Sequence, residues 1–355
     1  MRVGIYDPYF NGPLGGGERY ILTVAECLLA GGNQVDIFWN GQDIKKTAAE
    51  KLKINLSQAR FVRNIFTDSR GLIERLLVTK NYDVFFYLSD GSIPFLFARK
   101  NFIHMQVPLA NIKGKTMMNK LKLSLVKAVV CNSAFTKRTI DQVFGVNSIV
   151  LYPPVSIEEF TPMKKENVIL GVGRFTQAQH AKKQHVLVES FRRLVKRGLK
   201  NWELILAGGT LKSDEKYIVK LRDLAKGYPI RILTDISFVD LVKLYGKAKI
   251  FWHAAGFGED EQAYPERMEH FGIVVAEAMA AGCVPVVIKR GGIPEIVDNG
   301  VNGLVWETAG QLENLTLKLI NSEKMRKTLC EEAILAAHKF SKKAFCKNLN
   351  EIVKS

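Results

Sequence analysis

Three glycines, Gly15, Gly16 and Gly17, stand directly before an amphipathic run that stops at Gly31-Gly32. Consecutive glycines at a helix start expose backbone N–H groups, and these groups and the positive end of the helix dipole attract an anion such as a phosphate. An ordinary flexible turn is the alternative interpretation. The loop 11–17 is therefore a first candidate phosphate site.

A second glycine turn, Gly173 followed by Arg174, comes after an apolar strand-like run, and Lys182 and Lys183 follow it. A guanidinium and an ammonium can together neutralise a diphosphate. The turn fails as a dinucleotide-binding Gly-x-Gly-x-x-Gly fingerprint, because Thr176 stands where the third glycine is required. An NAD-dependent oxidoreductase is correspondingly disfavoured.

Two glutamates, Glu269 and Glu277, bracket the start of a mostly apolar segment, Gly272 to Ala281, which reads as a buried helix ended by Gly282. An unpaired carboxylate within such a helix is costly, so Glu277 needs a partner. The helix N-terminus between the two acids can receive an anion. The alternative interpretation is that Glu269 and Glu277 are simply two solvated acids.

The elements that must position these residues alternate between strand-like runs and helix-length segments, which predicts parallel sheets covered by helices. Ligands of such sheets bind at the carboxyl ends of the strands, so the loops there should carry the chemistry. The first series of strands is expected at residues 3–7, 34–39, 83–88, 102–105, 128–132 and 148–152, and the second at 168–172, 203–207, 230–233, 250–253, 284–288 and 303–306.

The two series of strands predict two domains of similar architecture. A Pro153-Pro154 pair and an acidic stretch lie between them, which is typical of an interdomain connection. We place the domains at 1–160 and 161–340. The remaining segment, 341–355, reads as a helix.

The composition fits a packed protein, with 355 residues, 47% of them hydrophobic, and a formal net charge of +16. No apolar run approaches the roughly 20 residues that span a bilayer, and the N-terminus enters a strand pattern instead of an export signal, so we expect a cytoplasmic protein. The five cysteines are odd in number and form no Cys-x-x-Cys pair, which predicts free thiols instead of a disulfide framework or a zinc site.

A basic region covers residues 91–140, which hold nine Lys and Arg and no acid. Within it, Lys113 to Val130 interleaves lysines with Met117, Met118 and Leu121, as an interfacial amphipathic helix would. We therefore expect an anionic membrane surface to bind Lys113 to Lys127. A solvated basic face is the alternative, and nucleic acid is not expected as a partner, because no nucleic-acid module surrounds these charges.

The order of these motifs resembles the retaining family 4 glycosyltransferases over nearly the whole chain. The Glu269-to-Glu277 spacing matches the family's Glu-x7-Glu pattern, and the runs Ala278 to Val287, Gly291 to Val297 and Asn302 to Leu304 follow in the family's order. The resemblance implies a GT-B fold: two Rossmann-like, doubly wound parallel-sheet domains that face a central cleft. It also implies that the helix 341–355 crosses back to the first domain.

The resemblance further assigns roles to single residues. It implies catalytic roles for Glu269, Arg174, Lys182 and His104, with Lys182 preferred over Lys183 by a count that the loop 177–181 leaves open by one residue. The donor site implied by the resemblance consists of Gly16, Gly17, Arg174, Lys182, Phe271, Gly272, Ile273 and Glu277.

The activity implied is metal-independent, retaining transfer of a hexose from a UDP-, GDP- or ADP-sugar to a lipid-linked or polysaccharide acceptor at the cytosolic membrane face. The chain lacks an Asp-x-Asp triplet, so no metal site or cofactor is expected. One departure from the commonest family form is the longer loop 256–265, which leaves the identity of the donor sugar open. A non-catalytic sugar-nucleotide or membrane-surface binding protein with the same fold is the alternative.

Overall fold

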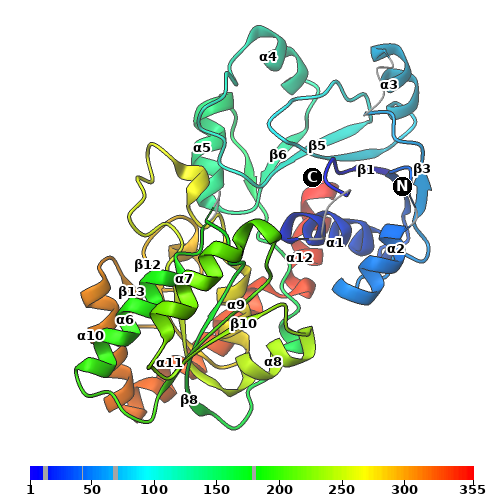
Figure 1. Ribbon diagram of the computed structural model, residues 1–355. Helices are drawn as coiled ribbons and strands as arrows, with labels where there is room; N and C mark the ends of the chain where they lie inside the picture. Colours follow the sequence, from blue (N-terminus) through cyan, green and yellow to red (C-terminus); the bar gives the residue numbers. More distant parts are fainter. Residues whose placement is uncertain (11–14, 42, 67–70, 178–180) are drawn as a thin grey trace. The chain divides into compact units, whose positions relative to one another are not determined.

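The chain forms two compact units, one of residues 1–154 with 342–355 and one of residues 155–341. The computed structural model describes residues 1–10, 15–41, 43–66, 71–177 and 181–355 (Figure 1). The chain thus leaves the first unit at Pro154, somewhat before the expected boundary near residue 160. Each unit is built on its own parallel sheet.

The first unit has a seven-stranded parallel sheet in the order β3-β2-β1-β4-β5-β6-β7. Strands such as β4 are buried along their whole length, as expected for parallel strands covered on both faces. The expected runs are present, and the short edge strand β3 was missed. The strands are β1 (Arg2–Tyr6), β2 (Gln34–Phe38), β3 (Arg60–Val62), β4 (Val84–Leu88), β5 (Lys100–Met105), β6 (Ala128–Cys131) and β7 (Ile149–Val150).

Helices cover both faces of this sheet and enclose two apolar cores. The C-terminal helix α12 packs against α1, so the end of the chain belongs to the first unit (Figure 1). The helices of this unit are α1 (Gly16–Ala30), α2 (Asp43–Thr47), α3 (Leu72–Thr79), α4 (Met117–Leu123), α5 (Ala134–Phe144) and α12 (Lys342–Lys354).

The amphipathic helix expected over Lys113 to Val130 is wrong in its extent. Helix α4 covers only Met117–Leu123, and the Thr116 hydroxyl caps its start by accepting the Asn119 N–H at 3.1 Å. The chain then turns through Ser124, and the β-branched residues that follow join the sheet as β6. Strand β6 pairs with β5 where the sequence analysis also expected a strand, so the helical pattern is realised only in α4.

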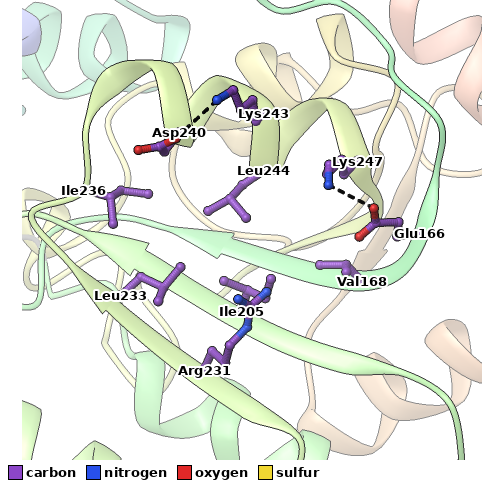
Figure 2. Close-up of a pocket in the computed structure, with 10 residues that line it drawn as sticks. All are labelled: Glu166, Val168, Ile205, Arg231, Leu233, Ile236, Asp240, Lys243, Leu244 and Lys247. Carbon is purple, nitrogen blue, oxygen red and sulfur yellow. Dashed lines mark hydrogen bonds and ion pairs between the residues drawn. The ribbon is translucent and has the colours of Figure 1, made fainter.

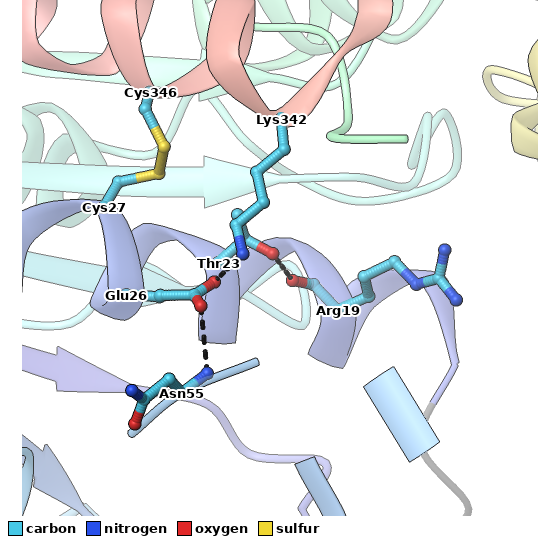
Figure 3. Close-up of a disulfide and its surroundings, with 7 residues drawn as sticks. All are labelled: Arg19, Thr23, Glu26, Cys27, Asn55, Lys342 and Cys346. Atoms are coloured by element: carbon cyan, nitrogen blue, oxygen red, sulfur yellow. Dashed lines mark hydrogen bonds and ion pairs between the residues drawn. A yellow bond between two sulfur atoms is a disulfide. The ribbon is translucent and has the colours of Figure 1, made fainter. Parts of the chain in front are cut away.

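A disulfide joins Cys27 of α1 to Cys346 of α12, which corrects the expectation of free thiols (Figure 3). Beside it, Lys342 forms an ion pair with Glu26, and the same carboxylate accepts the backbone N–H of Asn55 at 2.9 Å. The two cysteines are separated by 319 positions, and the sequence gives no sign that they meet. The remaining three cysteines are free.

The second unit has a six-stranded parallel sheet in the order β10-β9-β8-β11-β12-β13, and all six strands expected for it are present. Its strands are β8 (Glu166–Val172), β9 (Glu203–Gly208), β10 (Ile230–Thr234), β11 (Ala248–His253), β12 (Val284–Ile288) and β13 (Leu304–Trp306). Its helices are α6 (Gln184–Lys196), α7 (Glu215–Ala225), α8 (Phe238–Lys247), α9 (Ile273–Ala280), α10 (Ala309–Asn321) and α11 (Glu323–Ala337).

The longest helices, α1 and α11, have 15 residues each. Across the part of the chain that the structure describes, no helix combines the length and apolar character needed to cross a membrane.

Candidate active site

Glu269 lies at the centre of a charged cluster in the second unit. Its carboxylate accepts a hydrogen bond from the Lys182 ammonium at 2.6 Å and contacts His253 Nε2 at 3.0 Å. Burial alone would raise the pKa of Glu269, but the Lys182 charge and the His253 hydrogen bond outweigh it and hold the pKa well below its usual value. Because an ionised carboxylate only accepts, His253 Nε2 must carry a proton and donate it.

His253 is a site residue that the sequence analysis missed. It ends β11, and its side chain is buried with Nδ1 lacking a hydrogen-bond partner among the described residues. The available signal was its position at the carboxyl end of a strand, where side chains of parallel sheets meet ligands. Only the folded sheet brings it beside Glu269.

Lys182 and Lys183 have different partners in the structure. Lys182 reaches Glu269, whereas the ammonium of Lys183 lies 2.5 Å from Glu259, which also accepts a hydrogen bond from Arg267 at 3.0 Å. These two cations hold the pKa of Glu259 below its usual range. Lys183 therefore binds the long loop 256–265 through Glu259. Lys182 is the lysine beside Glu269, the first glutamate of the Glu-x7-Glu pattern.

The turn Gly173-Arg174 is held close to Lys182. The buried amide of Gln184 donates to the carbonyls of Gly173 at 3.1 Å and Arg174 at 2.9 Å. A Cβ on Gly173 would lie 2.8 Å from Lys182 Cγ, so the glycine allows the lysine stem to pass. Arg174 is exposed and forms no ion pair within the described ranges, which leaves its guanidinium available to an anion.

Glycines set the backbone around Glu269 and the start of α9. Gly272 precedes α9 with φ of 111°, in the left-handed region, and a Cβ there would lie 2.7 Å from Ile293 Cδ1. The N–H of Gly292 donates to the Glu269 carbonyl at 2.8 Å, and a Cβ on Gly291 would collide with that carbonyl. The glycine pair therefore supports the backbone that carries Glu269.

The predicted donor residues Phe271, Gly272 and Ile273 lie at the N-terminus of α9, close in sequence to Glu269. The first N–H groups of a helix have no intrahelical acceptor, and together with the helix dipole they favour an anion. The Phe271 ring itself is buried against Phe340, with the ring centroids 5.2 Å apart. Only the backbone at Phe271 therefore suits contact with a donor.

Glu277 lies within α9 and is 7% exposed. Its carboxylate accepts a hydrogen bond from the hydroxyl of Tyr245, which is buried in α8, at 3.1 Å. Tyr245 is thus the partner that a buried carboxylate needs, and the sequence did not single it out. The pair fixes the orientation of Glu277.

In the first unit, the two predicted features, the glycine loop and His104, both adjoin helix α1. Helix α1 begins at Gly16, as the glycine pattern predicts, and the Glu18 carboxylate accepts the Gly15 N–H at 2.7 Å. Residues 11–14 of the predicted phosphate loop lie outside the described residues. Gly17 faces the amide of Gln106, which would lie 2.3 Å from a Cβ on that glycine.

His104 lies in the core of the first unit, and the active-site role expected for it stays a prediction. Its ring is fully buried, stacks on Tyr20 with centroids 3.8 Å apart, and contacts the Val130 carbonyl through Nδ1 at 3.1 Å. Burial lowers the pKa of His104 to about 3, so the ring is neutral at physiological pH. Gln106, two residues later, is the polar side chain beside Gly17 at the start of α1.

A cavity of about 370 Å³ lies elsewhere in the second unit, between α8 and the strands β8, β9 and β10 (Figure 2). Its floor is apolar, and two charged pairs close its rim, Lys247 with Glu166 at 3.0 Å and Lys243 with Asp240 at 3.5 Å. None of the predicted site residues lines it. The charged cluster around Glu269 is therefore a separate feature at the carboxyl edge of the sheet.

Solved structures share this architecture over whole chains. The UDP complex of Anabaena Alr3699/HepE has a TM-score of 0.77 at 19% identity and covers 100% of both chains. A glycosyltransferase from Rickettsia africae has a TM-score of 0.76 at 19% identity, covering 99% of this chain and 97% of that one. At this identity the likeness establishes the two-domain GT-B fold alone.

Curated relatives carry glycosyltransferase names. An uncharacterized glycosyltransferase of Methanocaldococcus jannaschii is 29% identical over 235 residues, which is 65% of this chain and 60% of that protein. The GDP-Man:Man(3)GlcNAc(2)-PP-Dol alpha-1,2-mannosyltransferase of Neurospora crassa is 28% identical over 47% of this chain and 34% of its own. The alpha-1,3/1,6-mannosyltransferase ALG2 of Dictyostelium discoideum is 25% identical over 100% of this chain and 98% of its own.

The alignments thus span 60% and 34% of the first two relatives and nearly all of the third. The family model described as glycosyl transferases group 1 matches residues 155–335, which is more than half of the chain and includes the whole cluster around Glu269. The chain belongs to the glycosyl transferases group 1 family.

Proposed function

We propose that this protein is a retaining glycosyltransferase that moves a hexose from a nucleotide-diphosphate sugar to a lipid-linked or polysaccharide acceptor without a metal ion. The observation that carries the proposal is the ionised Glu269 held between Lys182 and His253, next to the N-terminus of α9. Such a cluster offers positive groups for a diphosphate and an anionic group for a sugar that becomes electron-poor. Membership of the family supports the reaction class.

In the proposed reaction, the bond between the anomeric carbon and the diphosphate oxygen breaks, and the acceptor oxygen forms its bond on the same face of the sugar. The acceptor proton passes to the departing diphosphate oxygen, so no strong base is required. Negative charge grows on the diphosphate, where the exposed Arg174 and the Lys182 ammonium would stabilise it. Lys182 has three N–H donors and can keep Glu269 while it contacts a phosphate oxygen.

Glu269 and Glu277 have different proposed roles because their surroundings differ. The ionised Glu269 would accept hydrogen bonds from sugar hydroxyls and oppose the positive charge that develops on the ring. Glu277, oriented by Tyr245, would accept hydrogen bonds from the donor ribose hydroxyls. The N–H groups of Gly272 and Ile273 would add donors near the phosphates.

The donor and acceptor classes draw support from relatives. The name of the Neurospora crassa relative specifies GDP-Man as donor and a PP-Dol-linked acceptor, and a neighbouring structure is a complex with UDP. We therefore propose a lipid-linked acceptor at the cytosolic membrane face, with the lysines of Lys113 to Lys127 drawn to anionic lipid, and we retain UDP-, GDP- and ADP-sugars as donors to be tested. Each basic residue near such a surface contributes about 1 kcal/mol.

Isothermal titration with a panel of UDP-, GDP- and ADP-sugars in EDTA tests the donor site, with Glu277→Ala as the variant. We expect one nucleotide class to bind the native protein and to bind the variant at least tenfold more weakly. Slow donor hydrolysis in EDTA, followed by NMR of the released sugar, reports the anomeric configuration and the need for metal.

Four outcomes would contradict parts of the proposal. If no donor binds, the protein is the non-catalytic alternative with an inherited fold. Inversion at the anomeric carbon would exclude the retaining mechanism, and hydrolysis that appears only after a divalent cation is added would exclude metal independence. Binding without hydrolysis or transfer to any lipid-linked acceptor would favour a sugar-nucleotide binding protein.

A further inference from the structure

Helix α3 exposes a continuous apolar face in the first unit. Leu72, Ile73, Leu76 and Leu77 are all exposed, at 49%, 74%, 36% and 49%. Positions separated by four residues lie above one another on a helix, so these four side chains form one stripe. Four large apolar side chains exposed on an eight-residue helix are unusual for a surface that faces only water.

A second exposed apolar group lies on α4 and includes Met117 at 82%, Met118 at 53% and Leu121 at 56%. Both helices pack against the same core of the first unit, α3 through Val78 and α4 through Leu123. They therefore cover the same face of the sheet, and Figure 1 shows both at the top of the view.

The segment that links the two helices in space also carries apolar side chains. The Phe97 N–H donates to the Thr79 hydroxyl of α3 at 3.1 Å, and the Lys122 ammonium of α4 lies 5.3 Å from the centre of the Phe95 ring. The Phe95 and Phe97 rings stack with their centroids 6.1 Å apart. The segment from Phe95 to Phe97 therefore contacts both α3 and α4.

The charge around this surface selects among possible occupants. Lys113, Lys115, Lys120 and Lys127 are exposed around α4, and residues 91–140 contain no acid. A second copy of the chain would bring two basic surfaces together, which is unfavourable. An anionic lipid bilayer offers both an apolar interior for the side chains and negative headgroups for the lysines.

We infer that α3 and α4 together form a docking surface for an anionic lipid bilayer, in which α3 inserts Ile73 and Leu77 below the headgroups while the lysines of α4 contact them. This inference rests on the proposed function for its purpose, because it explains how the enzyme would approach a lipid-linked acceptor. It adds α3, an element without a basic cluster, to the membrane contact. Apolar insertion makes the binding only partly sensitive to salt.

The test compares two variants of the full chain, each of which introduces two aspartates at exposed apolar positions. The first is Ile73→Asp with Leu77→Asp on α3, and the matched control is Val219→Asp with Leu335→Asp on α7 and α11, where the native side chains are 50% and 64% exposed. Co-sedimentation with phosphatidylcholine vesicles containing phosphatidylglycerol gives the partition constant. Donor binding in solution, measured without vesicles, reports separately on the proposed function.

We expect the α3 variant to lose about tenfold or more in vesicle partitioning, since each apolar insertion stabilises binding strongly, while the control binds like the native protein. All three proteins should bind the donor equally. Equal partitioning of the α3 variant and the native protein would overturn the role of α3. Failure of the native protein to bind anionic vesicles would overturn the docking surface, even if donor binding is intact.

A second measurement does not depend on loss of binding. Leu77→Trp places an indole on the α3 stripe, and Val219→Trp places one on the control helix. Brominated lipids should quench the added fluorescence of the first variant only. Quenching of neither, or of both equally, would contradict insertion by α3.

Discussion

The carboxyl edges of the two sheets hold polar side chains in opposite ways. In the second unit, the Glu269 carboxylate accepts hydrogen bonds from Lys182 and His253. The Gln184 amide fixes the neighbouring turn by a hydrogen bond to its backbone. In the first unit, one carboxylate oxygen of Asp7, at the end of β1, is buried without a hydrogen-bond partner within the described residues. The same architecture therefore holds an ionised carboxylate between two partners in one unit and a partly unsatisfied carboxylate in the other.

This difference shows that sheet topology alone does not produce a site. In the second unit, the loop after β8 and the end of β11 bring Lys182 and His253 to Glu269. The ion pairs of the first unit lie elsewhere, for example between Arg60 and Asp36 of two neighbouring strands. The first unit instead relies on a long-range covalent link between α1 and α12. The predictions below test each side of this contrast.

Breaking the disulfide should have the largest effect on stability. A cross-link between residues 319 positions apart reduces the entropy of the unfolded chain, which corresponds to about 6 kcal/mol in the chain-entropy model. We expect Cys346→Ser to lower the midpoint of guanidinium unfolding without reductant. Cys330→Ser, which removes a free thiol in the second unit, serves as the control. Equal midpoints for Cys346→Ser and the native protein would contradict the cross-link.

Removing Lys182 should have the largest effect on the proposed reaction. Lys182→Ala deletes the cation beside Glu269, and loss of such a contact costs about 3–4 kcal/mol, or two to three decades in kcat. Lys183→Ala is the matched control, because Lys183 pairs with Glu259 instead. Steady-state transfer rates distinguish them. A larger loss from Lys183→Ala would reverse the assignment of the two lysines.

The unsatisfied edge of the first unit should give a pH signature through Asp7. Burial, with a further contribution from Glu18, raises the pKa of Asp7 to about 7, so the folded state holds the proton more tightly than the unfolded chain. The native protein is therefore most stable, with respect to this group, below the unfolded pKa near 3.9, and it loses this contribution as pH rises through 7. Ionisation of Asp7 then disfavours the folded state.

Asp7→Asn removes this ionisation and should raise the free energy of unfolding at pH 8 by about 4 kcal/mol, an effect that fades toward pH 4. Urea unfolding at several pH values measures it, with the exposed Asp43→Asn on α2 as a comparison. A gain that is equal at pH 4 and pH 8 would show that the titration of Asp7 is not its cause.

The smallest expected effect comes from Tyr245→Phe in the second unit. The change deletes one hydrogen bond to Glu277 and should weaken nucleotide binding by about 1 kcal/mol, or about fivefold. A dideoxynucleotide lacks the ribose hydroxyls, so its affinity should not change. Equal losses for both nucleotides would indicate a purely structural role for Tyr245.

Much of the fold was readable from local patterns. Buried parallel strands are continuous apolar runs, so β4, β8 and β12 were placed correctly, and the glycine stops located α1. The three-residue edge strand β3 carries too short a pattern to detect, and its Arg60 pairs with Asp36 of β2, a contact visible only after the strands align. The helix expected over Lys113 to Val130 is confined to Met117–Leu123, because the chain turns at Ser124 and the last residues of that range belong to β6.

The candidate site likewise has features that the sequence predicts and features that only the fold decides. The sequence by itself determined the Glu-x7-Glu spacing, the glycine turns and the basic side chains, because these are properties of residue type and separation. Tertiary structure decided that Lys182 instead of Lys183 meets Glu269, that His253 and Tyr245 complete the carboxylates, and that His104 is buried. It also brought Cys27 to Cys346. Such pairings depend on which strand ends and helices become neighbours, a geometry that burial of the apolar cores imposes and that spacing along the chain does not encode.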